Sequence, residues 1–188
     1  MLKLHIIVVS TRPERVGPSI AAWVEDFARR HGKFEIRLVD LAEVNLPFLD
    51  EPVHPRLMKY EHEHTKRWSA LVAAADAYAF VTPEYNYSVP APLVNALDFV
   101  YREWNYKPAC FVSYGGQSGG LRAVQMAKPL LTTLKMMPIP EAVSIPFFPQ
   151  HRDQTGKFRP TEAHEKSATE MLDELLKWAE ALRPLRAQ

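Results

Sequence analysis

The chain has 188 residues, of which 47% are hydrophobic and 24% charged, and its formal net charge is +1 at pH 7. This length is most simply one globular domain, residues 1–188, with a substantial buried core. So small a net charge excludes the strong basic field of a protein that binds nucleic acid or anionic membrane, and no apolar segment is long enough to span a bilayer. The one cysteine, Cys110, excludes an intrachain disulfide and fits the cytoplasm.

A strand, a loop and a helix are predicted at the start of the chain. Leu4–Val9 is a continuous apolar run rich in β-branched residues, which is typical of a parallel strand covered on both faces. From Ile20 to Phe27 apolar residues recur at helical spacing, and the pattern stops at Gly32. A loop between such a strand and helix directs free backbone N–H groups and the positive end of the helix dipole at an anion.

This first loop carries the side chains that a phosphate group prefers. Ser10 and Ser19 provide hydroxyl donors, and Arg12 and Arg15 provide planar guanidinium groups. The chain has neither a lysine-bearing P-loop nor a G-x-G-x-x-G fingerprint, so the loop suits a monophosphate. The alternative is a solvated basic loop in front of a helix.

A second strand and a long loop are predicted next. Phe34–Val39 alternates apolar and charged residues, so we expect a more exposed strand that Asp40 closes. Leu41–Tyr60 is rich in proline and is predicted to be an irregular but ordered loop, of the kind that caps a site or builds a subunit interface. We expect its large apolar side chains to be buried: Leu46, Phe48, Leu49 and Leu57.

The segment Glu61–Thr65 has the sequence E-H-E-H-T, which invites comparison with a metal site. His62 and His64 are two positions apart, a spacing that places them on different sides of a helix, whereas a helical metal pair needs i, i+4 spacing. The segment is therefore predicted to be the charged start of an amphipathic helix that ends near Asp76, and no metal is expected.

The stretch Thr82–Asp98 is predicted to carry the ligand-binding loop. It follows the buried strand Ala77–Val81, and Pro90 and Pro92 suit the first turn of the next helix. Between strand and helix lie Glu84, Tyr85, Asn86 and Tyr87. Because ligands bind outside the carboxyl ends of parallel strands, this stiff loop suits a planar heterocycle. The alternative is an ordinary turn whose tyrosines pack locally.

The third loop holds a glycine cluster. Ala109–Tyr114 is a buried strand, and Gly115–Gly120 after it contains four of the seven glycines, which lets backbone approach a ligand closely. Leu121–Met136 is predicted to be a helix that Pro129 kinks or restarts. The last strand is predicted at Ala142–Phe148.

The end of the chain is predicted to be a polar loop and a long helix. Gln150–Pro160 forms the loop, and apolar residues from Ala168 to Leu182 lie on one helical face. In total, five strands alternate with five helical segments, which indicates a doubly wound, parallel α/β sandwich with strand order 2-1-3-4-5. In that order the loops after Val9, Val81 and Val112 meet at one edge of the sheet.

Three stretches together resemble a known family. They are Ser10–Pro18, Thr82–Asn86 with Asn95–Asp98 after it, and Ser113–Gly120. In these stretches the chain resembles the NADPH-dependent FMN reductases, flavodoxin-like proteins that include flavin, quinone, azo-dye and chromate reductases. The resemblance implies a flavodoxin-like three-layer sandwich, with a five-stranded parallel sheet and helices on both faces.

The resemblance also implies which residues bind FMN. The phosphate would be held by Ser10, Arg12, Arg15, Val16 and Gly17. The isoalloxazine ring would be lined by Pro83, Glu84, Tyr85 and Asn86. Its other edge would be closed by Ser113, Tyr114, Gly115, Gly116 and Ser118.

The implied activity is that of an FMN-dependent NAD(P)H oxidoreductase. It would pass a hydride through bound FMN to a small acceptor such as a quinone, free flavin or azo dye, with NADPH or NADH as co-substrate. This scheme requires no side-chain acid or base, so we name no catalytic residue. One alternative is an FMN-binding redox sensor with little turnover, and another is a non-flavin enzyme on the same fold.

The resemblance further implies a homodimer or homotetramer with the flavin near the subunit interface. The Leu46–Tyr60 loop, which is apolar and contains prolines, and the turn at Trp104 are the predicted interface segments.

Overall fold

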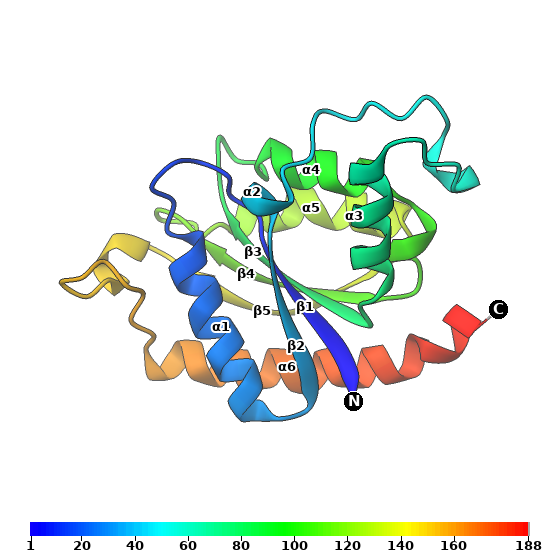
Figure 1. Ribbon diagram of the computed structural model, residues 1–188. Coiled ribbons are helices and arrows are strands. Elements are labelled where there is room, and N and C mark those ends of the chain that lie inside the picture. The colour runs from blue at the N-terminus through cyan, green and yellow to red at the C-terminus, as the bar shows by residue number, and fades with distance from the viewer. Residues whose placement is uncertain (188) are drawn as a thin grey trace.

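The computed structural model describes residues 1–187 and shows a five-stranded parallel sheet between two layers of helices (Figure 1). The strand order is β2-β1-β3-β4-β5, which confirms the predicted fold class. The strands are β1 (Leu2–Val8), β2 (Phe34–Asp40), β3 (Ala77–Pro83), β4 (Pro108–Tyr114) and β5 (Met137–Ile145). The helices are α1 (Gly17–His31), α2 (Leu41–Val44), α3 (Glu63–Ala73), α4 (Ala91–Asp98), α5 (Leu121–Thr133) and α6 (Glu162–Leu182). Short 3-10 turns lie at Pro55–Leu57, Arg102–Trp104, Phe148–His151 and Arg183–Ala187.

The two faces of the sheet are covered by different helices. Helices α1 and α6 pack on one face, and α3, α4 and α5 pack on the other (Figure 1). All residues of β3 and β4 are buried, because these central strands are covered on both sides. Strand β2 lies at an edge and alternates between buried and exposed residues, as its sequence predicts.

The core beneath α3 and α4 contains a cluster of aromatic rings. Trp104 is fully buried, its ring centroid lies 4.9 Å from that of Tyr78, and its indole N–H donates to the carbonyl of Leu97. The prediction that the Trp104 turn supplies interface surface is therefore wrong for the tryptophan itself. Its hydrophobic area is already used inside the subunit.

The boundaries of β1 and β5 differ from the predictions. Strand β1 ends at Val8, although the N–H of Val9 still donates to Val81 at 3.0 Å. Strand β5 begins at Met137, five positions before the predicted start, and a register shift interrupts its pairing with β4. Pro138 and Pro140 conceal this strand in the sequence. Proline is tolerated there because β5 has a neighbour on one side only.

The two C-terminal helices largely follow their sequence patterns. Helix α5 runs unbroken through Pro129, which excludes a restart of the helix there. Helix α6 buries the predicted face against the sheet, and its N-terminus is capped by Thr161, whose hydroxyl accepts from the N–H of His164. None of the helices in the described part of the chain is long and apolar enough to cross a membrane.

The loop after β2 projects from the body of the subunit (Figure 1). Phe48 is 87% exposed, Leu57 60% and Leu49 43%, so the predicted burial of these side chains is wrong, and only Leu46 is half-buried. No element among residues 1–187 covers these three side chains. Their burial requires a surface outside the single chain.

The two histidines at the start of α3 also differ from expectation. Their rings stack with centroids 5.1 Å apart instead of pointing to different sides of a helix. The reason is that His62 is the N-cap residue with extended backbone, so helical spacing does not apply to it. Both rings lie near Asp50, and His64 Nε2 is 2.9 Å from its carboxylate. Among residues 1–187 no group of three or more His, Cys, Asp or Glu side chains is arranged to hold a metal ion.

Candidate functional site

The candidate site lies at the carboxyl ends of β1, β3 and β4. Val8 pairs with Val81, and Val81 pairs with Val112, so these three strands end side by side. The loops that follow them are called here the first loop (residues 9–16), the second loop (residues 84–90) and the third loop (residues 115–120). Together they form the rim of the sheet. The parallel register thus brings the predicted site segments together.

The first loop is joined to the second through two hydroxyl groups, and the start of α1 lies close to the end of β4. Ser10 is fully buried, and its Oγ lies 2.8 Å from the hydroxyl oxygen of Tyr85 in the second loop. A β-carbon on Gly17 would lie 3.0 Å from the hydroxyl oxygen of Tyr114 at the end of β4. Glycine is therefore the residue that lets α1 begin this close to the rim.

The cations of the first loop differ in their surroundings. Arg12 is exposed, whereas Arg15 is half-buried and forms an ion pair with Asp40 at the end of β2. The Nε of Arg15 is buried and has no hydrogen-bond partner within residues 1–187. A buried donor without a partner is costly, so this atom marks a place where an anion would bind. Sequence reasoning did not assign Asp40 to the site. Its position at the carboxyl end of a strand beside β1 was the available signal.

The start of α1 leaves few backbone donors free for an anion. Its N-cap residue is Val16, which supplies no side-chain hydrogen bond, but Pro18 has no N–H, and the N–H groups of Ser19 and Ile20 both donate to the carbonyl of Val16. The hydroxyl of Ser19 accepts from the backbone N–H of Phe158 at 2.7 Å. The polar loop before α6 therefore packs against the start of α1, a contact between distant parts of the chain that no sequence motif predicts.

The second loop forms a tight hairpin. Tyr85 N–H donates to the carbonyl of Ser88 at 3.0 Å, and Ser88 N–H donates back at 2.9 Å. Asn86 has a φ of 50° and Tyr87 a φ of 66°, the positive values that a two-residue type I′ turn requires. The turn leaves Asn86 exposed and Tyr87 67% exposed. Strand β3 continues through Pro83 to this turn, beyond the predicted end at Val81.

Glu84 connects the second loop to the third. Its carboxylate accepts from the Ser118 hydroxyl at 2.7 Å and from the backbone N–H of Arg122 at 3.1 Å. The Arg122 guanidinium also pairs with Glu84 at 3.1 Å and lies 4.0 Å from the ring centroid of Tyr87. Because Gly120, the N-cap residue of α5, has no side chain, Glu84 caps this helix from another loop.

The glycines of the third loop have different roles. Gly119 and Gly120 have positive φ values, and β-carbons there would lie 2.2 Å from Ser144 Oγ and 2.8 Å from Ser113 Cβ. A β-carbon on Gly116 would meet nothing within 4 Å. The Ser113 hydroxyl donates to the carbonyl of Gly119 at 2.8 Å, which holds the loop closed. The first pair shapes the loop, and Gly116 leaves open space above it.

Tyr114 contributes a neutral hydroxyl to the rim. Burial raises the pKa of Tyr114 well above its ordinary value, and the neighbouring Tyr85 raises it further, while Ser10 and Arg15 oppose the shift. The phenol therefore stays protonated at neutral pH and can donate a hydrogen bond. Gly115 has its N–H engaged with the carbonyl of Ile145 at 3.2 Å.

A cavity of about 500 Å³ opens next to the first loop. Thr11 contributes from the first loop, Leu41–Phe48 from the α2 segment, and Ala91–Ala96 from α4. Phe48 stands at its edge with most of its ring exposed. This apolar surface adjoins the rim.

The model of the NADPH-dependent FMN reductase family matches residues 2–150. An NAD(P)H-dependent FMN reductase of Schizosaccharomyces pombe is 44% identical over 140 residues, which cover 73% of this chain and 70% of that protein. A quinone reductase of Pseudomonas putida is 32% identical over 145 residues, 73% of this chain and 74% of its own. The crystallised flavoenzyme NAD(P)H:(acceptor) oxidoreductase of Paracoccus denitrificans has a TM-score of 0.75 and 23% identity, and the alignment covers 96% of this chain and 98% of that chain. At this identity the structural likeness concerns the fold.

Proposed function

This chain belongs to the NADPH-dependent FMN reductase family, and on that premise we propose that it carries electrons from NAD(P)H to a quinone or another small, flat acceptor. FMN, when bound, supplies the ring that takes up the hydride and passes the electrons on. The observation that carries the proposal is the joining of three loops at the rim by the Ser10–Tyr85 and Glu84–Ser118 hydrogen bonds.

The first loop fits the phosphate end of the cofactor. The unpartnered Nε of Arg15 supplies a donor, and Arg12 adds a cation at the surface. Asp40 holds Arg15 in place by pairing with the other side of its guanidinium. These groups bind and orient one phosphate.

The second and third loops fit the ring end. The exposed Asn86 amide offers both a donor and an acceptor, Gly116 leaves open space, and Tyr85 and Tyr114 offer phenol hydroxyls. Glu84 keeps the two loops at a constant separation through Ser118. These residues bind, orient and exclude water, and none needs to exchange a proton during turnover.

The proposal is tested by the visible spectrum of the protein after incubation with FMN and desalting, followed by anaerobic NADPH. Retained flavin bands that bleach with NADPH and recover with a quinone are expected. Bands that persist with NADPH would instead identify a redox sensor with little turnover. If the protein retains no flavin, the proposal that the rim binds FMN is wrong.

Replacing Arg15 tests the phosphate end separately. Arg15→Ala is expected to weaken FMN binding by about ten- to a hundredfold, the usual effect of losing a charge-assisted hydrogen bond. Lys166→Ala, an exposed cation on α6, serves as the control and should bind FMN as the wild type does. Equal FMN affinity in both variants would contradict the phosphate assignment, provided that thermal unfolding shows Arg15→Ala to be folded.

We also propose that the active form is a homodimer or homotetramer assembled through the Leu46–Tyr60 loop. The exposed Phe48 of this loop lines the cavity at the rim, and Leu49 and Leu57 are exposed farther along the loop, so a second subunit would cover both the cavity and these side chains.

A further inference from the structure

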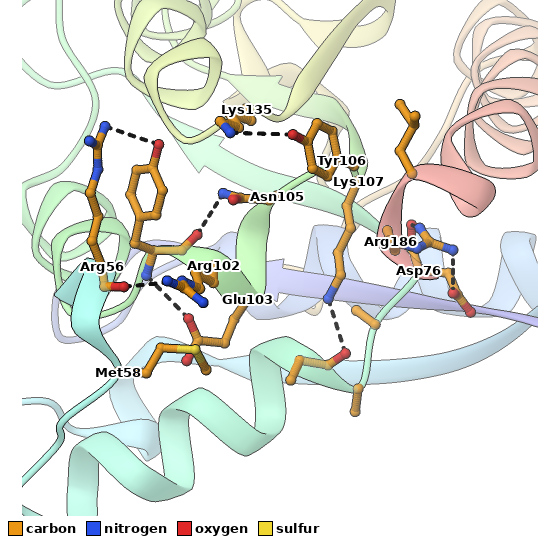
Figure 2. Close-up of a pocket in the computed structure, with 15 residues that line it drawn as sticks. Arg56, Met58, Asp76, Arg102, Glu103, Asn105, Tyr106, Lys107, Lys135 and Arg186 are labelled. Carbon is orange, nitrogen blue, oxygen red and sulfur yellow. Dashed lines mark hydrogen bonds and ion pairs between the residues drawn. The ribbon is translucent and has the colours of Figure 1, made fainter. Parts of the chain in front are cut away.

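A second cavity, of about 760 Å³, lies at the opposite end of the sheet from the rim. It is enclosed by the segments that precede the central and edge strands: Ala73–Asp76 before β3, Tyr101–Lys107 before β4, and Lys135 before β5 (Figure 2). Arg56 and the C-terminal Arg186 complete its wall. Each of these strands spans roughly 20 Å, so a ligand held here would not touch the rim.

The lining of this cavity is dominated by cations. Two carboxylates are present, and both already have ion-pair or hydrogen-bond partners within the chain. Asp76 pairs with Arg186 at 2.7 Å. Glu103 is buried and accepts hydrogen bonds from the hydroxyls of Tyr60 and Ser69.

Besides the buried Lys107, three lining cations have no carboxylate within 4.0 Å in residues 1–187, namely Arg56, Arg102 and Lys135. Lys107, the remaining cation, lies at the base of the cavity, and its ammonium donates to the carbonyls of Val72 and Ala73. The uncompensated positive charge is therefore at the cavity wall.

The three unpaired cations are oriented by neutral groups. Arg56 donates to the Tyr101 hydroxyl at 3.2 Å, Lys135 approaches the Tyr106 hydroxyl at 3.3 Å, and Arg102 donates to the carbonyl of Arg56 at 3.1 Å. A guanidinium has five N–H donors and an ammonium three, so each side chain keeps donors for a ligand. Figure 2 shows Arg56, Arg102 and Lys135 around the space that the cavity occupies.

The backbone of the wall is strained at three points. Met58, Tyr106 and Lys135 have φ values of 53°, 58° and 56°, which non-glycine residues adopt at an energetic cost. The N–H of Tyr106 donates to the carbonyl of Lys135 at 2.9 Å, so a backbone hydrogen bond joins two of these strained residues. Strained residues concentrate at ligand-binding sites because the conformation serves to place side chains.

We propose that this cavity is a second binding site, for a phosphorylated small molecule of nucleotide size. Arg56, Arg102 and Lys135 would bind the phosphate, since three unpaired cations match a dianion. The rings of Tyr101 and Tyr106 would line the organic part, and the volume lies in the range of small-molecule pockets. This site does not rest on the function proposed for the rim, because the two share no residue.

The experiment is a calorimetric titration of the FMN-saturated protein with adenosine 5′-monophosphate as the probe. Binding to the wild type is expected, with affinity that falls as salt is added. Arg102→Gln and Lys135→Gln are each expected to weaken binding about tenfold. Adenosine without the phosphate should bind more weakly than either variant binds the nucleotide.

Two control variants locate the bound probe. Lys166→Ala on α6 and Arg12→Ala at the rim should leave the affinity unchanged. The proposal is overturned if the probe does not bind, if the cavity variants bind it as tightly as the wild type, or if Arg12→Ala alone weakens binding. The last result would place the probe at the rim. Circular dichroism and thermal unfolding of Arg102→Gln should match those of the wild type, which shows that the variant is folded.

Discussion

At the scale of single residues, Gly120 is closely surrounded by side-chain and backbone atoms of β4. A β-carbon there would lie 2.8 Å from Ser113 Cβ and 2.9 Å from the backbone nitrogen of Tyr114, with φ at +84°. Gly120→Ala is therefore expected to lower the free energy of unfolding by about 2 to 4 kcal/mol, from backbone strain and overpacking together. Urea unfolding followed by circular dichroism measures this, and FMN retention should fall as well.

Gly116 provides the matched control in the same loop. Its β-carbon would meet nothing within 4 Å, so Gly116→Ala should change the free energy of unfolding by less than about 0.5 kcal/mol. Any loss of FMN affinity in this variant would then report the approach of the ligand to the loop. Equal destabilisation by the two substitutions would show that the loop lacks the geometry described here.

The sequence predicted the residue types of the rim but not their individual roles. The glycine cluster was evident, yet the sequence does not distinguish Gly116 from Gly120, because the difference arises when the loop folds back onto Ser113 and Tyr114 at the end of β4. In the same way, Glu84 was expected beside a ring, and its bonds to Ser118 and Arg122 depend on the distance between two strands. The fifteen proposed cofactor contacts remain predictions.

At the scale of elements, Glu84 is expected to hold the second loop against α5. Glu84→Ala would leave the Ser118 hydroxyl and the Arg122 N–H without their acceptor, which costs about 1 to 3 kcal/mol. The change in the free energy of unfolding is measured by urea titration. Glu25→Ala, which removes an exposed helical ion pair with Arg29, is the control and should cost less than about 0.5 kcal/mol.

Lys107 joins the end of α3 to the start of β4 and makes stability depend on pH. Burial lowers its pKa from 10.5 to about 7, with Arg186 adding to the effect and Asp76 and Glu103 opposing it. Between these values the unfolded chain binds a proton that the folded chain does not, so stability falls as the pH falls from 10.5 to 7.

We expect the difference in unfolding free energy between the wild type and Lys107→Met to change with pH. Relative to this variant, the wild type should lose roughly 2 to 4 kcal/mol of unfolding free energy across that pH window and nothing further below it. The lost hydrogen bonds to Val72 and Ala73 are the same at every pH and cancel from the comparison. Parallel stability curves for the two proteins would show that Lys107 titrates normally.

The sequence predicted elements well where their period was regular and poorly where proline or a helix end intervened. Strands β1, β3 and β4 were found because their apolar runs are continuous. The first half of β5 was missed because Pro138 and Pro140 imitate a loop, although an edge strand tolerates them. The stacking of His62 on His64 was missed because helical geometry was assumed one residue too early.

At the scale of the whole molecule, the exposed Leu46–Tyr60 loop is expected to control assembly. Phe48→Glu should shift the protein towards monomers, because a charge replaces a ring that is 87% exposed in the single subunit. Light scattering after gel filtration measures the mass. Met126→Glu on α5, which is 55% exposed, is the control and should leave the mass unchanged. A monomeric wild type would contradict the proposed interface directly.

The strand order and the meeting of the three loops could be predicted because both follow from the alternation of strands and helices. The cavity beyond the amino ends of the strands could not. Arg56, Lys135 and Arg186 come from distant parts of the chain and share no motif. Only the folded structure shows that these cations surround one space.

The burial of Cys110 has a practical consequence for spectroscopy. This single thiol is fully buried in the central strand β4, where burial raises its pKa well above the ordinary value. It should therefore resist maleimide and spin-label reagents in the native state. A cysteine introduced on the second loop or in the cavity wall would then be the only reactive thiol among residues 1–187. Motions at either end of the sheet could be followed without first removing the native cysteine.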